Sequence, residues 1–196
     1  ASHKARRAEL KNLLFYFPFR WEDFSKITPM AKLKPGISAN VVGRIELIQN
    51  KRVLLRLDLD VPLKEVNGVM IIEDDTRLMA GMETLGLCLE FASSVTICGH
   101  LGRPEGKEDP KLSVKPIVDW LEEGYGHIQL PEGKLHILEN LRFESGEDAA
   151  DPVFAKELAS HGDFYVYEAF ATHRPAASTT VVPTLLPHAA GLRFAR

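Results

Sequence analysis

Arginine, histidine and aspartate side chains recur just after four short apolar segments of this 196-residue chain. The apolar segments are residues 53–57, 95–98, 135–138 and 164–167. The polar side chains that follow them are Asp58, Asp60, Arg77, His100, Arg103, Arg142 and Arg174. The planar fork of arginine matches the oxygens of phosphate and carboxylate groups. The set therefore predicts a binding site for a small anion that carries a phosphate, a carboxylate or both.

The same residues also have a purely structural interpretation. A single arginine after a strand is usually a solvated loop residue, and Asp58 and Asp60 are good turn formers ahead of Pro62. Recurrence at four successive segment ends favours a ligand site for the arginines over solvated loops. For the two aspartates, turn formation and a polar role at the site both stay open.

The elements around these residues indicate an α/β fold with a doubly wound parallel sheet and helices on both faces. Amphipathic helices are predicted over residues 76–91, 113–123 and 152–162, between the apolar segments. Short apolar strands that alternate with such helices are typical of parallel sheets, whose ligands bind at the carboxyl ends of the strands. We expect Asp75, Ser113 and Asp151 to cap the helices.

Composition and net charge argue against general binding to nucleic acid, a membrane-spanning segment and a cysteine metal site. A formal net charge of −3 gives no general attraction to nucleic acid or to anionic lipid, so any anion site must be a local cluster. No apolar run reaches membrane-spanning length. Cys88 and Cys98 show no metal-type spacing, and we expect Cys98 to be a small buried hydrophobe in a reduced, cytoplasmic setting. No metal site is predicted.

Five segments, in order, resemble the phosphoglycerate kinase family. Residues 56–62 resemble its R-x-D-x-N-V-P signature, and residues 74–77, 100–104 and 138–143 follow in the family's order and spacing. Residues 168–179 are similar to the family's D-A-F-G-T-A-H-R-A-H-A-S-T segment. The likeness covers residues 52–196, which we take as a domain similar to the N-terminal half of that enzyme, with a Rossmann-like fold.

The resemblance implies a role for each residue of the predicted site. Arg77 corresponds to the catalytic arginine that steadies the transferring phosphoryl group. The basic patch that holds 3-phosphoglycerate corresponds to His100, Arg103, Arg142 and Arg174, and Asp58 to the acidic residue near the substrate hydroxyls. The implied reaction is phosphoryl transfer between Mg-ATP or ADP and 3-phosphoglycerate or 1,3-bisphosphoglycerate.

Three departures from the family pattern bear on this expectation. Asp60 stands where the family has asparagine, and a carboxylate beside an anionic ligand repels it unless it is protonated or paired. The segment 171–178 is one residue shorter than the family's, and Glu168 replaces an aspartate. The nucleotide-binding half is not within these 196 residues. We therefore expect the chain alone to be inactive, and a separate nucleotide-binding domain is a candidate partner.

Residues 1–51 form a predicted N-terminal appendage with a helix over residues 9–16 and a strand over residues 40–49. Residues 14–47, with Phe17–Asp23, Thr28–Met30 and Leu33–Gly36, are similar to the start of the wedge domain of RecG-type DNA helicases. Two alternatives to a half-kinase follow from this. One is a nucleic-acid-binding wedge fragment, although we expect nucleic-acid binding less than binding of phosphoglycerate. The other is a chimeric chain without selected activity.

Overall fold

The computed structural model describes residues 48–123, 133–169, 171 and 174–194. The predicted appendage, including its helix over residues 9–16 and most of its strand over residues 40–49, lies outside these residues. Within the described part, no helix is long and apolar enough to cross a membrane.

A five-stranded parallel sheet forms the centre of the domain. Its strands are β1 (Arg52–Arg56), β4 (Ser94–Cys98), β5 (Leu135–Ile137), β6 (Phe164–Tyr167) and β7 (His188–Ala190), in the spatial order β5-β4-β1-β6-β7. Register pairs Val53 of β1 with Val95 of β4 and with Phe164 of β6. The four apolar segments therefore all form parallel strands, as predicted, and β7 was not predicted.

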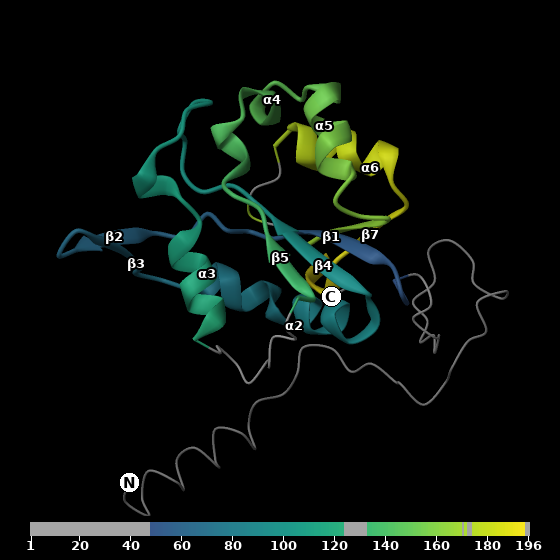
Figure 1. Cartoon of the computed structure of the whole chain (residues 1–196), viewed down its shortest axis with the longest axis horizontal. Helices are drawn as coiled ribbons and strands as arrows, with labels where there is room; N and C mark the ends of the chain where they lie inside the picture. The colour runs from purple at the N-terminus through teal and green to yellow at the C-terminus, as the bar shows by residue number, and fades with distance from the viewer. Residues whose placement is uncertain (1–47, 124–132, 170, 172–173, 195–196) are drawn as a thin grey trace, which may run out of the picture. The chain divides into compact units, whose positions relative to one another are not determined.

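Helices cover both faces of this sheet, as the sequence predicts (Figure 1). On one face lie α2 (Thr76–Phe91) and α3 (Lys115–Glu122). On the other lie α4 (Ser145–Asp148), α5 (Pro152–Ala159) and α6 (Val182–Leu185). The chain passes from β1 outward to β4 and β5 and then returns to β6 on the opposite side of β1. This reversal of direction is the position where open α/β sheets bind ligands.

Successive side chains of β1 point to opposite faces of the sheet and so contribute to two separate core layers. Val53 and Leu55 pack with the stripe Leu78, Met82, Leu85 and Leu89 of α2, and Leu54 packs with α5 on the other face. Because successive side chains of a strand point to opposite faces, Arg56 lies on the same side as Leu54. Its side chain is buried there, with 1 % of the residue exposed.

The predicted helix caps are confirmed only in part, whereas the predicted burial of Cys98 is confirmed. Asp151 caps α5 and accepts a hydrogen bond from the backbone NH of Val153. Ser113 is not the N-cap of α3; it lies one residue before the N-cap, Val114, and accepts a hydrogen bond from the NH of Lys115. Asp75 does not cap α2 with its side chain; the neighbouring Asp74 accepts from the NH of Thr76 instead. Cys98 is fully buried, as predicted, and burial raises the pKa of its thiol to about 12.

A two-stranded antiparallel hairpin was not predicted. It comprises β2 (Leu63–Val66) and β3 (Val69–Ile72), which follow the Asp60 loop. Asn67 and Gly68 join the strands, both with positive φ, and Asn-Gly is the dipeptide that two-residue hairpin turns favour. That dipeptide was the available signal for the hairpin.

The central strand gives a direct test of the two-layer core. Leu55 is fully buried, and its truncation to alanine leaves a cavity that should lower the free energy of unfolding by about 2–5 kcal/mol. Val69, which is 62 % exposed on β3, supplies the matched control, and Val69→Ala should change stability by no more than about 0.5 kcal/mol. Denaturant unfolding measures both; equal midpoints for the two variants would contradict the proposed core.

Candidate functional site

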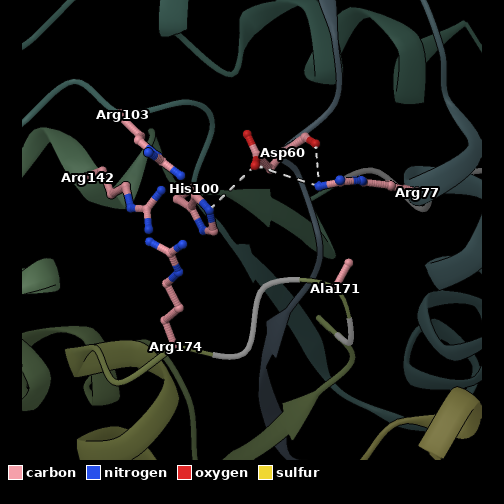
Figure 2. Close-up of a pocket in the computed structure, with 7 residues that line it drawn as sticks. All are labelled: Asp60, Arg77, His100, Arg103, Arg142, Ala171 and Arg174. Atoms are coloured by element: carbon pink, nitrogen blue, oxygen red, sulfur yellow. Dashed lines mark hydrogen bonds and ion pairs between the residues drawn. The ribbon is translucent and has the colours of Figure 1, made fainter.

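A polar pocket of about 240 Å³ opens at the carboxyl edge of the sheet. Loops that follow β1, β4, β5 and β6 contribute to it, together with the first turn of α2. We call it the basic pocket. Its lining residues are Asp60, Arg77, His100, Arg103, Arg142, Ala171 and Arg174 (Figure 2).

Three of its arginines converge at one end. Figure 2 shows the guanidinium groups of Arg103, Arg142 and Arg174 directed toward one another from three different loops. We call these residues the three-arginine group. Like charges brought together in this way repel one another unless an anion lies between them. The arrangement therefore suits a phosphate, which accepts several charge-assisted hydrogen bonds at once.

Within this group, two hydrogen bonds hold the side chain of Arg142 in place. Its Nε donates to Asp148 at 3.0 Å, and its Nη1 donates to the backbone oxygen of Gly102 at 2.8 Å. The side chain of Asn140 accepts from the NH groups of both Leu101 and Arg142, which ties the loop after β5 to the loop after β4. Two of the arginine loops thus form one unit before any ligand binds.

His100 is held by a neighbouring arginine. The Nη2 of Arg56 lies 2.7 Å from Nδ1 of His100. Because a guanidinium can only donate hydrogen bonds, Nδ1 must be the acceptor, and the ring proton is then on Nε2. His100 therefore presents an N–H donor toward the pocket, where Nε2 lies 3.9 Å from the Oδ2 of Asp60.

The same arginine also binds the π-helix Ala177–Val181, which follows β6 in the chain. Nε of Arg56 donates to the hydroxyl of Ser178 at 3.0 Å, and that hydroxyl donates to the buried carboxylate of Glu147. Glu147 also accepts from the backbone NH of Ser178 at 2.9 Å. A buried guanidinium and a buried carboxylate are thus joined through a hydroxyl group, which lowers the cost of burying either charge.

Electrostatics keep His100 neutral. Burial, followed by the positive charges of Arg56, Arg142, Arg77 and Arg174, lowers the pKa of its ring to about 3. The residue is only 5 % exposed. The positive charge of the basic pocket therefore comes from its arginines, while His100 contributes a neutral donor.

Asp60 and Arg77 form the opposite end of the pocket. Arg77 donates from Nη1 to the backbone oxygen of Asp60 at 2.9 Å and lies 3.6 Å from its Oδ2. The other carboxylate oxygen, Oδ1, accepts from the backbone NH of Gly102 at 2.8 Å. One oxygen of Asp60 therefore holds the loop after β4, and the second faces the pocket beside Arg77 (Figure 2).

Six of the seven predicted site residues line the pocket; Asp58 does not. It is buried, accepts from the NH of Asp60 and lies 3.7 Å from Arg77. Burial raises the pKa of its carboxyl group, and the nearby Arg77 opposes that shift. Asp58 therefore lies behind the pocket, where it supports the turn and Arg77 together, so the two interpretations from the sequence are compatible.

Three contributors were not predicted. Ala171 lines the pocket, Asn140 joins two loops, and Arg56 orients His100. The signal for Arg56 was its place within the apolar run of residues 53–57. A charged side chain buried in such a strand requires several polar partners. Among the described residues, no group of three or more His, Cys, Asp or Glu side chains is placed to hold a metal ion.

Comparison with protein families and with known proteins matches this chain to phosphoglycerate kinases. The phosphoglycerate kinase family model matches residues 44–196. A phosphoglycerate kinase of Parafrankia sp. is 41 % identical over 170 residues, which cover 74 % of this chain and 42 % of that protein. One of Borreliella burgdorferi is 36 % identical over 173 residues, covering 79 % of this chain and 43 % of the relative.

Solved structures agree with this result. The phosphoglycerate kinase structure from Coxiella burnetii matches with a TM-score of 0.63 and 34 % identity, over 73 % of this chain and 39 % of that one. The structure from Pyrococcus horikoshii OT3 gives a TM-score of 0.61 at 27 % identity. The chain thus spans about two fifths of the length of the relatives it matches.

The neutral state of His100 makes stability depend on pH. An unfolded histidine takes up a proton near pH 6.5, whereas folded His100 stays neutral to about pH 3. Between these values the unfolded state binds more protons, so the free energy of unfolding falls as the pH falls. His100 alone should account for a loss of roughly 2–3 kcal/mol between about pH 7 and pH 4.

A His100→Gln variant isolates this effect. Glutamine can still accept from Arg56 and donate toward the pocket, but it does not titrate. Carboxylates titrate in both proteins, so the readout is the difference between their stabilities, measured by urea unfolding at a series of pH values. We expect the parent protein to lose stability faster than the variant toward acid pH; parallel curves would contradict a neutral, buried His100.

Proposed function

Because this chain belongs to the phosphoglycerate kinase family, we propose that its described domain binds 3-phosphoglycerate in the basic pocket. The observation that carries the proposal is the convergence of Arg103, Arg142 and Arg174 at the carboxyl edge of the sheet, with Arg77 and the N–H of His100 in the same pocket. The three-arginine group holds the phosphate, and the remainder of the acid extends toward Arg77.

In the proposed reaction this domain supplies half of the machinery. A carboxylate oxygen of 3-phosphoglycerate attacks the terminal phosphorus of Mg-ATP, ADP leaves, and 1,3-bisphosphoglycerate forms; the reverse reaction makes ATP. Such transfer depends mainly on positioning and on stabilisation of charge, and Arg77 at the rim serves the second purpose as the catalytic arginine. Its side chain is 45 % exposed, which leaves it free to reach a phosphoryl group above the pocket.

The nucleotide is the second substrate in this proposal. We assign no nucleotide-binding residue to the described part of the chain, and a further domain is required to bring Mg-ATP to the pocket. Turnover in the family needs two halves that close and exclude water. Binding of the acid substrate is therefore the function to test first. A cytoplasmic setting for the reaction and nucleic-acid binding by residues 14–47 both remain predictions.

Titration of the chain with 3-phosphoglycerate tests the proposal, by calorimetry or by NMR shifts. Saturable binding is expected, and Arg103→Ala should weaken it about tenfold or more, because a charge-assisted hydrogen bond contributes about 1.5–3 kcal/mol. Arg193→Ala supplies the control, since Arg193 is exposed and outside the pocket. Absence of saturable binding by the folded protein, or equal effects of the two substitutions, would overturn the proposed function.

A further inference from the structure

The two ends of the basic pocket differ in charge. The three-arginine group supplies only hydrogen-bond donors at one end. The other end pairs the guanidinium of Arg77 with the carboxylate of Asp60, 3.6 Å apart. A ligand complementary to both ends carries a phosphate at one end and groups of both signs at the other.

The carboxylate of Asp60 has an oxygen to offer such a ligand. Its Oδ1 is committed to the NH of Gly102 at 2.8 Å. Its Oδ2 lies 3.6 Å from Nη1 of Arg77 and 3.9 Å from Nε2 of His100, both longer than a hydrogen bond. Among the described residues, no group donates to Oδ2 within hydrogen-bond distance, and the side chain is 34 % exposed at the pocket.

An ammonium group is the ligand donor that matches this oxygen best. A hydroxyl can also donate to Oδ2, but a protonated amine adds attraction between opposite charges, and charge-assisted hydrogen bonds are the stronger kind. The neighbouring Arg77 suits a carboxylate in the same way. An arginine beside an aspartate is thus complementary to the ammonium and carboxylate of an α-amino acid.

The balance of charge leads to the same ligand class. With Asp60 in place, the net charge of the pocket is lower by one unit than it would be with a neutral amide at this position. A three-carbon phosphorylated acid with an ammonium at C2 likewise carries one negative charge fewer than the same acid with a hydroxyl at C2. Charge complementarity discriminates between ligands of similar shape in this manner.

We propose that Asp60 sets the specificity of the basic pocket, so that it prefers a phosphorylated amino acid of the O-phosphoserine type to 3-phosphoglycerate. This inference rests on the proposed function, because it uses the same pocket and the same phosphate-binding group. Asp60 selects through its free oxygen, Oδ2, while Oδ1 keeps the loop of Gly102 in place.

Asp60→Asn is a closely matched test. An asparagine oxygen can still accept from the NH of Gly102, and its NH₂ group then replaces Oδ2, so that an acceptor becomes a donor at constant shape. Asp119→Asn controls for net charge, because Asp119 lies on α3, pairs with Lys115 and does not line the pocket. Spectra of the backbone amides establish that each variant is folded.

The experiment is a calorimetric titration of the full chain with 3-phosphoglycerate and with both enantiomers of O-phosphoserine. For the parent and Asp119→Asn, we expect one phosphoserine enantiomer to bind about tenfold more tightly than 3-phosphoglycerate. For Asp60→Asn, this preference should disappear or reverse. The ligand series on the parent protein is informative even if the variant does not fold.

The possible outcomes separate the two proposals. Equal or tighter binding of 3-phosphoglycerate to the parent, or a preference unchanged in Asp60→Asn, overturns the role of Asp60 and leaves the proposed function standing. Binding of neither ligand type overturns the proposed function, and this inference with it. Tight phosphoserine binding that is lost on Asp60→Asn, while 3-phosphoglycerate binding is kept or strengthened, supports both.

Discussion

The guanidinium of Arg56 is buried at the carboxyl end of the central strand, and the candidate site is organised around it. A buried charge is costly unless its donors are satisfied. Here they are satisfied by the backbone oxygen of Leu57, the ring of His100 and the hydroxyl of Ser178. Those partners lie on three separate segments: the loop after β1, the loop after β4 and the π-helix Ala177–Val181. Hydrogen bonds to one buried cation thus hold these three segments together beside the pocket.

The main features of this fold follow from patterns visible in the sequence. The stripe from Leu78 to Leu89 predicted α2 because one helix face must be buried, and the apolar runs predicted four of the five strands in the sheet. The hairpin of β2 and β3 was missed although Val69–Ile72 is an apolar run after Asn67-Gly68, because its two strands have four residues each and do not show the polar-apolar alternation of a half-buried strand. Likewise, β7 has only three residues, and its pairing with β6 depends on contacts distant in sequence.

The candidate site also has features that could be predicted from the sequence and features that could not. Its membership could be predicted, because the carboxyl ends of parallel strands meet at one edge and bring Arg103, Arg142 and Arg174 together whatever their rotamers. The protonation of His100 and the position of Asp58 could not be predicted. The proton of His100 is placed by a contact with Arg56, 44 residues earlier in the chain, and Asp58 lies behind the pocket because of the turn that it stabilises. Spacing along the chain carries no information on such side-chain directions.

Asp60 shows how a structural role and a ligand role can be separated within one side chain. The hydrogen bond from Gly102 requires an acceptor at this position, but it does not require a charge, and a neutral amide meets that need equally well. Among the described residues, the second oxygen accepts no hydrogen bond; it lies 3.6 Å from the guanidinium of Arg77 and 3.9 Å from the neutral ring of His100. The hydrogen bond from Gly102 therefore gives no reason for the negative charge, whose ion-pair partner in the fold is Arg77 at 3.6 Å. What the charge does change is the electrostatic potential that an entering ligand meets, so its effect is on the choice of ligand.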